Sequence, residues 1–510
     1  LSLIAFKAIK PYAIITKYKK VTLKNNIKNI FLMEIRMKDL DVIIVGAGPV
    51  GLHMGICLAR QGISFAIYDK KPGPTTSSNA VGVNSRTLEI WRSLGFSDKA
   101  ISRGLKVYGT SLHSDKKLIN KIDFDIIESD FKFTLSLPQA DTEKLLLEQL
   151  QASGHYINWN NELLELTQNE NEVSAYFTTN TGERRVKAQW IIGCDGYKSV
   201  VRELSSISRD CHDLPLHFLM VDAEVKGAIA MDTINLLLHN HGLIFTIPMR
   251  NNVRVVAEIS SDKKYKSLKN CDPQIFRNII QERCPDMSIG RVDWSSAFYI
   301  HECLAINYRK GRVLLAGDAA HAHSPIGGQG MNTGLQDTWN LSWKLAMVIH
   351  NQASEKLLDS YSQERRTIGL EVLKRSGRLT SAATTGNFML KHLRNFCIKY
   401  LIKIEMIRRK MANGIAQTNI CYENSSLVNH KQVIKQKLRY SQYQDGWTVL
   451  TNEEYPDNIF PAFIRVRHSD EAFTNECNFC LIRPDGYTAI YAKTLAQIQE
   501  YFVANHIFIN

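Results

Sequence analysis

Short apolar runs that end at glycine or at an acidic residue form the clearest pattern along the chain. Four of them, at 41–45, 64–68, 190–194 and 312–316, consist mainly of Val, Ile, Leu and Ala. Apolar runs of this length, bounded by turn residues, are typical of buried strands. Because a helical pattern follows the first run, the sequence predicts an α/β fold with a Rossmann-like domain.

A second set of strand patterns lies between His217 and Ser260. Its four runs begin at Phe218, Ile234, Leu243 and Val253, and polar or Gly/Asn turns separate them. This spacing predicts a mixed or antiparallel sheet inserted into the α/β part, with one face against a core or pocket.

From about Ser354 the pattern becomes helical. Between 388 and 411 apolar residues recur mostly at steps of three and four, with lysines and arginines between them. A basic amphipathic helix of this kind either binds a membrane or partner, or packs on the protein with its basic face in solvent. We favour the packed helix.

The net charge is informative only when its distribution along the chain is considered. The chain has 510 residues, enough for about three domains, and a net charge of +13. Residues 1–38 hold nine basic side chains and one acid, so most of the excess lies there. We expect this basic leader to lie outside the fold, as an over-extended start rather than a targeting segment. The remaining charge gives little support to nucleic-acid binding.

The cysteine pattern and the hydropathy indicate in which cellular compartment the protein works. The ten cysteines show no disulfide spacing, which predicts a reducing cytoplasm, and we interpret Cys477 and Cys480 as strand residues rather than a redox or zinc pair. No apolar stretch reaches the length of a membrane span, so we expect no integral membrane segment.

A dinucleotide motif follows the first apolar run. Gly46, Gly48 and Gly51 form a GxGxxG turn, and Asp69 ends the second run. In such units the first glycine permits the turn, the second lets a pyrophosphate approach the backbone, and the third lets the helix pack closely. A carboxylate at Asp69 would bind ribose hydroxyls. The motif alone does not separate FAD from NAD.

The stretch after the fourth run is unusual in its lack of charge. Asp318 is followed by eighteen uncharged residues, four of them glycine, before Asp337. Together with Asp195-Gly196 and the GxGxxG turn, it resembles the fingerprints of the single-component FAD-dependent aromatic-ring hydroxylases, the family of phenol and 3-(3-hydroxyphenyl)propionate hydroxylases. The resemblance covers roughly residues 41–378.

The resemblance implies roles for the residues of this stretch. Asp318 would bind a ribityl hydroxyl of FAD, and Pro325, Gly328 and Gly330 would pass along the isoalloxazine ring. Amides of a helix that begins at Met331 and Asn332 would face the pyrimidine edge and stabilise the reduced, anionic flavin.

Further positions follow from the same resemblance. Asp195 belongs to the second fingerprint, Gln139 would reach the ribose or ribityl region, and Arg86 would lie near the pyrophosphate. Asn79 departs from the family, in which many members carry arginine at this position. His321 and His323 lack a carboxylate ligand set, so we expect no metal there, and Asp337 and Asn340 fit packing or capping positions.

The resemblance also implies a discontinuous domain organisation. The C-terminal part keeps an Arg-Pro-Asp-Gly-Tyr strand motif but is about half the length expected of a thioredoxin-like module. The expected units are an FAD-binding domain at 39–107, 138–207 and 292–378, a substrate domain at 108–137 and 208–291, a helical region at 379–425, and a shortened thioredoxin-like module at 426–510.

The function implied is that of an FAD-dependent monooxygenase. NAD(P)H and dioxygen would be co-substrates, and a small phenolic or other activated aromatic compound would be hydroxylated through a flavin hydroperoxide. The sequence identifies no catalytic base, and whether the chain forms a homodimer is left open. The alternatives are a monooxygenase of the same fold that acts on a polyketide or quinone precursor, and a flavin-binding protein without turnover.

Overall fold

The computed structural model describes residues 40–76, 80–114, 117–227, 229–260, 262–323, 328–384, 388–429, 439–440, 442, 444, 446–455, 459–468 and 477–508. The expected leader, Asn79 and Pro325 lie outside these residues. Within them, no helix is long and apolar enough to cross a membrane.

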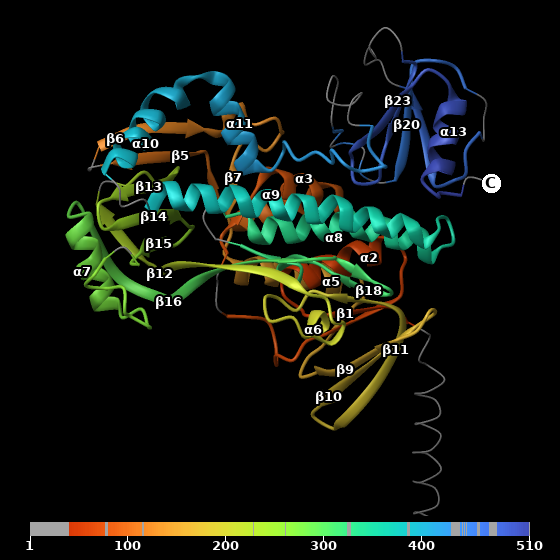
Figure 1. Cartoon of the computed structure of the whole chain (residues 1–510), viewed down its shortest axis with the longest axis horizontal. Helices are drawn as coiled ribbons and strands as arrows, with labels where there is room; N and C mark the ends of the chain where they lie inside the picture. The colour runs from red at the N-terminus through yellow and green to blue at the C-terminus, as the bar shows by residue number, and fades with distance from the viewer. Residues whose placement is uncertain are drawn as a thin grey trace, which may run out of the picture.

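A sheet with a parallel centre forms the middle of the α/β part (Figure 1). β1 lies between β2 and β11, β11 also pairs with β18, and these pairings are all parallel. The sheet consists of β17 (Arg309–Lys310), β18 (Val313–Leu315), β11 (Gly182–Gly193), β1 (Leu40–Val45), β2 (Phe65–Tyr68) and β8 (Ile157–Asn158). β10 (Val173–Thr179) pairs antiparallel with β11, and β9 (Glu162–Gln168) pairs antiparallel with β10. All four predicted apolar runs are therefore found in one sheet.

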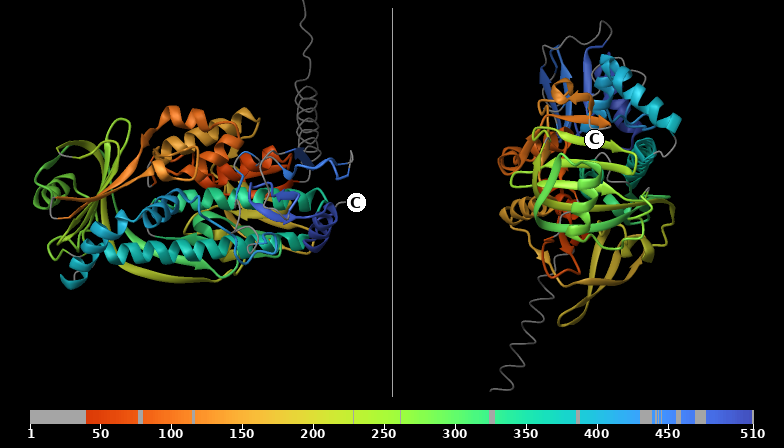
Figure 2. Two further views of the ribbon diagram at one scale, coloured as in Figure 1. Left: turned by 90° about the horizontal axis from the view of Figure 1, so that it is seen from above. Right: turned by 90° about the vertical axis from the view of Figure 1, so that its left-hand side faces the viewer.

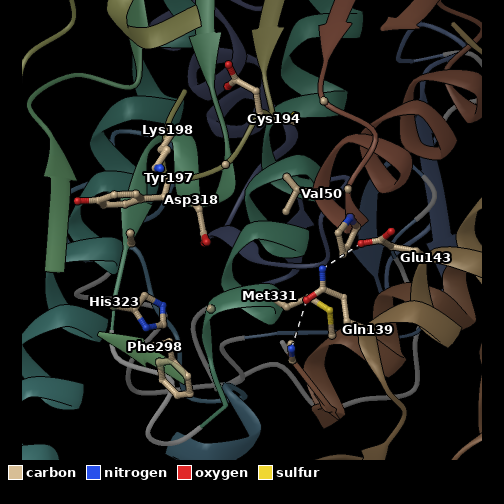
Figure 3. A pocket seen from close by; sticks show the side chains of 18 of the residues that line it. Val50, Gln139, Glu143, Cys194, Tyr197, Lys198, Phe298, Asp318, His323 and Met331 are labelled. Carbon is tan, nitrogen blue, oxygen red and sulfur yellow. Dashed lines mark hydrogen bonds between the residues drawn. The ribbon is translucent and has the colours of Figure 1, made fainter. Parts of the chain in front are cut away.

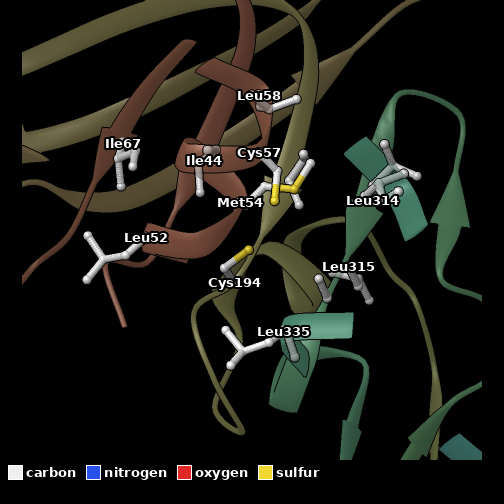
Figure 4. Close-up of a cluster of buried hydrophobic side chains, with 14 of the residues drawn as sticks. Ile44, Leu52, Met54, Cys57, Leu58, Ile67, Cys194, Leu314, Leu315 and Leu335 are labelled. Carbon is white, nitrogen blue, oxygen red and sulfur yellow. The ribbon is translucent and has the colours of Figure 1, made fainter. Parts of the chain in front are cut away.

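Helices cover this sheet and bury its apolar side chains (Figure 4). Side chains of α2 such as Leu52 and Met54 pack in one cluster with Ile44 of β1 and Leu335 of α8. The helices of this part are α2 (Pro49–Arg60), α3 (Ser85–Ser93), α4 (Ser97–Arg103), α5 (Gln139–Ala152), α6 (Val200–Leu204), α8 (Gly330–Ile349) and α9 (Asp359–Thr384). A small sheet joins β3 (Gly82–Val83), β7 (Thr134–Ser136) and β4 (Leu105–Val107) beside them.

A second eight-stranded sheet extends from the first part, as Figure 2 shows. Its order is β19 (His321–Ala322), β16 (Met287–Ala305), β12 (Arg209–Gly227), β15 (Val253–Glu258), β14 (Gly242–Pro248), β13 (Ile234–His239), β5 (Gly109–Ser114) and β6 (Lys117–Asp123). Only β13 and β5 pair in parallel. Helix α7 (Pro273–Arg283) packs on it. The long strand β16 crosses the domain boundary that we placed between 291 and 292.

Two features of this sheet region differ from the sequence-based expectations. A disulfide joins Cys211 of β12 to Cys303 of β16, which face each other in the strand register. The two residues are 92 positions apart, so their pairing follows from the sheet and not from any local spacing. The prediction of a chain without disulfides is therefore corrected.

The second difference concerns α10 (Phe388–Tyr400) and α11 (Glu405–Ala416), which follow α9. Ile398 and Ile402 pack against the second eight-stranded sheet, but Met389, Leu393 and Phe396 are exposed. The predicted helices are present, yet the face in solvent is apolar as well as basic. Helix α10 is therefore packed on the protein, but its solvent face is not the purely basic face that we expected.

The C-terminal part forms a four-stranded sheet of its own (Figure 1, dark blue). Its order is β21 (Ile464–His468), β20 (Trp447–Thr451), β22 (Phe479–Ile482) and β23 (Thr488–Ala492), and helix α13 (Leu495–Ala504) follows. β20 and β21 are parallel, whereas β22 is antiparallel to both of its neighbours. Cys480 lies buried within β22.

Candidate active site

A cavity of about 580 Å³ lies where the carboxyl ends of β1, β2 and β11 meet the start of α8 and one face of the second sheet. In an open parallel sheet this edge is where ligands bind. Asp318, Met331 and Gln139 approach the cavity from three different segments, and Phe298 lies at the side of the second sheet (Figure 3). The fold thus brings together residues that are far apart in sequence.

The GxGxxG turn adopts the geometry that its glycines predict. Gly46 has φ +102°, and a Cβ on it would lie 2.4 Å from the Cys194 carbonyl oxygen. A Cβ on Gly51 would lie 1.9 Å from the Gly46 carbonyl oxygen. Gly48 is different, because a Cβ there meets no protein atom within 4 Å, and Gly48 lines the cavity. Two glycines are needed by the protein itself, and the third leaves space beside the first turn of α2.

Asp69 lines the cavity at the end of β2 and also supports the turn. One carboxylate oxygen accepts a hydrogen bond from the Ala47 amide at 2.6 Å, and the other accepts from the Lys71 amide at 2.8 Å. A carboxylate offers about four lone-pair positions, so acceptor capacity for hydroxyl groups in the cavity is left.

Two further carboxylates, Asp195 and Asp318, line the cavity. Because these enclosed positions are poorly hydrated, the pKa of both carboxyl groups is raised. One Asp195 oxygen accepts from the Val201 amide at 3.1 Å, while the other is buried without a hydrogen-bond partner among the described residues. The Asp318 side chain is exposed to the cavity and points into it (Figure 3). Donors on a polyhydroxylated ligand would satisfy both groups.

The start of α8 forms another wall. Gly328, Gly330 and Met331 line the cavity, and Gly328 has φ +63°. Asn332 does not line it. Its amide side chain instead accepts from the Asn84 amide at 3.0 Å and donates to the Gly82 carbonyl at 2.8 Å, which fixes the helix start against the β3–α3 segment. The first turn of α8 contains no acidic residue, so its positive end is not neutralised locally.

Of the two remaining predicted residues, one lines the cavity and one does not. The Gln139 side chain lines it, accepting from the Ala80 amide at 3.2 Å and donating to Glu143 at 2.9 Å. Arg86 is absent from the lining. It is fully buried and donates to Glu89 at 3.0 Å and to the Asp485 carbonyl at 2.8 Å. The expected contact of Arg86 with the pyrophosphate is therefore corrected: Arg86 instead forms a hydrogen bond to the C-terminal part.

His321, the first of the two histidines after Asp318, is bound by Asp337. This buried carboxylate accepts from His321 at 2.6 Å, from the Gly317 amide at 3.0 Å and from Arg365 at 2.7 Å. Although burial opposes ionisation, His321 and Arg365 outweigh it and lower the pKa of Asp337. Across the described residues there is no group of His, Cys, Asp or Glu suited to a metal ion.

The second sheet contributes a wall that the sequence indicated only partly. Phe245 and Ile247 lie on β14, one of the strands that we predicted between 217 and 260, but Phe298 lies on β16, which no pattern revealed. Arg254 also lines the cavity, and its guanidinium makes two hydrogen bonds of 2.7 Å to Asp222. A single buried arginine in a strand gives no sequence signal of a site.

These features describe a site at the edge of a parallel sheet, opposite a separate sheet, whose residues fit a flavin adenine dinucleotide. The glycine turn, the open space at Gly48, the cavity carboxylates and the uncharged wall at α8 all fit FAD. Comparison with known proteins agrees, since the FAD binding domain family matches residues 39–376.

Individual relatives and structures support the same assignment. The chain is 30% identical to 6-methylpretetramide 4-monooxygenase of Streptomyces rimosus over 74% of this chain and 68% of that protein. It is also 30% identical to pentachlorophenol 4-monooxygenase of Sphingobium chlorophenolicum, over 66% and 63% of the two chains. The fold of an anhydrotetracycline hydroxylase from Streptomyces rimosus matches with a TM-score of 0.76 at 24% identity, over 92% of this chain and 99% of the other.

The chain belongs to the family of FAD-dependent aromatic hydroxylases. It is an FAD-dependent monooxygenase.

Proposed function

We propose that the protein hydroxylates a phenolic or other activated aromatic compound with dioxygen and NAD(P)H. The observation that carries the proposal is the single cavity in which the three FAD fingerprints face the apolar residues Phe245, Ile247 and Phe298 of a second sheet. The names of the relatives, which act on a chlorinated phenol and on a polycyclic polyketide, support an aromatic substrate.

Each part of the site has a proposed role. Bound FAD supplies hydride acceptance and the activation of dioxygen. The α2 amides beside Gly48 bind the pyrophosphate, Asp69 the ribose, and Asp195 and Asp318 the remaining hydroxyl-bearing part. The first turn of α8 presents its positive end to negative charge on the flavin, while Phe245 and Phe298 exclude water from the aromatic ring.

The finer parts of the assignment are also proposals. We propose that NAD(P)H binds only transiently, that the chain works as a homodimer in the cytoplasm, and that the C-terminal part is a shortened thioredoxin-like module. The pairing order of β20 to β23 and the helix that follows them support the last point.

Substrate-dependent consumption of NAD(P)H tests the function. We expect slow NAD(P)H oxidation by the protein alone and a strong increase with a suitable phenol, because reduction without a substrate would waste the reductant as peroxide. Absorbance of the nicotinamide, release of peroxide and product mass are followed across a panel of substituted phenols and polycyclic polyketides. A gain of one oxygen with little peroxide supports hydroxylation. If only a polyketide responds, the phenol assignment is lost and the monooxygenase assignment stands.

Replacing Asp318 with alanine should weaken FAD binding by about 1.5–3 kcal/mol, which is roughly a 10- to 150-fold rise in Kd. The reason is the loss of a charge-assisted hydrogen bond at the centre of the cavity. Asp318→Asn keeps one acceptor and should lose less. Fluorescence titration of the apoprotein with FAD measures both variants, and an exposed acid outside the cavity, Asp293→Ala, is the matched control. Unchanged affinity in Asp318→Ala would remove this residue from the site.

A further inference from the structure

Helix α10, the turn at 401–403 and the start of α11 carry a continuous row of large apolar side chains in solvent. Seven of them are between 42% and 79% exposed. We define the α10–α11 apolar surface by these residues: Met389, Leu393, Phe396, Tyr400, Leu401, Ile404 and Met406. In Figure 1 this part of the chain arches over β5 and β6. Exposed apolar groups gathered in this way mark an interaction surface rather than the scattered exposure of an ordinary protein surface.

Helical geometry shows that this surface is separate from the face that holds α10 in place. Met389, Leu393, Phe396 and Tyr400 follow one another at steps of four, three and four, which places them on one side of α10. Ile398 lies on the opposite side and packs against the second eight-stranded sheet. The fold therefore already uses the inner face of α10, and the outer apolar face is not needed to anchor the helix.

The charge around the surface selects its partner. Residues 388–410 contain seven basic side chains against one acid, Glu405. The basic ones are Lys391, Arg394, Lys399, Lys403, Arg408, Arg409 and Lys410. A second copy seated symmetrically on this surface would bring two such clusters together, which is unfavourable. An anionic lipid surface matches both properties, because it accepts apolar side chains below its headgroups and attracts the flanking cations.

We propose that the α10–α11 apolar surface docks the protein on the surface of an anionic bilayer. The docking is peripheral, with Leu393, Phe396 and Tyr400 inserted at headgroup depth and Lys399 and Lys403 at the phosphates. An aromatic side chain with a polar tip, such as Tyr400, suits this boundary.

The position of the surface connects docking to the cavity. Ile398, on the inner face of α10, packs in one cluster with Met220, Val256 and Phe298, and these three residues line the cavity. One helix therefore separates the docked face from the wall of the cavity. On the proposed function, this places the site beside a phase into which apolar aromatic compounds partition.

Vesicle co-sedimentation of the full FAD-loaded chain tests the proposal. We expect binding to phosphatidylcholine vesicles that contain phosphatidylglycerol, weaker binding to phosphatidylcholine alone, and a decrease with salt. Leu393→Ser/Phe396→Ser should lower the partition coefficient at least about tenfold, because two apolar side chains no longer leave water. Lys399→Gln and Lys403→Gln should each lower it by about fivefold. The matched control is Tyr156→Ser/Leu164→Ser, which removes two exposed apolar side chains outside this surface.

Three outcomes would overturn the proposal: no binding to the anionic vesicles, equal binding by Leu393→Ser/Phe396→Ser, or a dimer in light scattering that this variant abolishes. The last result would assign the surface to a second copy. FAD content and NAD(P)H oxidation without vesicles should be the same in the variant and in the parent. Because vesicle binding is measured without turnover, its failure is distinguishable from failure of the proposed reaction.

Discussion

Replacing Gly51 with valine should give a protein that no longer retains FAD. A Cβ at this position would lie 1.9 Å from the carbonyl oxygen of Gly46, and that oxygen belongs to the backbone of the turn itself. The turn cannot move away without losing its own support, since Gly46 donates its amide to Tyr68 at 2.8 Å and already lies against Cys194. Helix α2 would shift from β1, and its N-terminal amides would no longer meet a pyrophosphate.

The flavin absorbance of the purified variant, with circular dichroism for the fold, measures this effect. Gly73→Val is the matched control, because a Cβ there meets nothing within 4 Å. Gly48→Ala gives a sharper comparison. Gly48 has φ −75°, which any residue adopts, and open space for a Cβ. A stable Gly48→Ala protein that binds FAD weakly would show that the cofactor occupies this space. Full FAD retention by Gly51→Val would contradict the prediction.

Replacing Glu364 with glutamine should lower the free energy of unfolding by about 3–5 kcal/mol. Glu364 of α9 is buried, and its carboxylate accepts from Lys344 of α8 at 2.7 Å and from Arg483 of the C-terminal part at 2.7 and 2.9 Å. Burial opposes its ionisation, but the charges of Arg483 and Lys344 outweigh burial and lower the pKa of Glu364. The glutamine variant leaves these two buried cations without their shared anion.

Urea unfolding of the FAD-loaded protein measures this loss. The control is Arg409→Ala, which breaks an exposed ion pair with Glu405 and should change stability by less than about 0.5 kcal/mol. Arg483 keeps its ion pair with Asp485, whereas Lys344 loses its ion-pair partner, so the double variant Lys344→Met/Glu364→Gln should recover part of the stability. A loss below about 1 kcal/mol in Glu364→Gln would show that the cluster does not hold the C-terminal part to α8 and α9.

Much of the lining of the cavity was predictable because its residues lie at the ends of strands. Gly46, Asp69, Asp195 and Asp318 each follow an apolar run, and parallel strands bring such ends to one edge of a sheet. Arg86 shows the limit of the same reasoning. Its partners Gln444 and Asp485 lie more than 350 residues away, and no local pattern indicates them.

The part of the lining that the second sheet contributes was less predictable than the part at the ends of the parallel strands. Strand β16 does not keep a clean alternation, because its long middle section is only partly buried on both faces. Phe298 therefore gave no sign of facing the cavity. The basic and apolar residues of α10 showed a helix, but periodicity could not show which of its faces the protein would cover.

The sequence by itself determined the class of protein. Close backbone packing around a dinucleotide demands particular residues at fixed local spacing, such as the glycines of the first turn and the uncharged stretch after Asp318, and local spacing can be read along the chain. Only the tertiary structure decided which surfaces meet, including the Cys211–Cys303 pairing, the tie of Arg86 to Asp485, and the exposed side of α10. These contacts depend on strand register and on helix orientation, which are set by packing between segments that are distant in sequence.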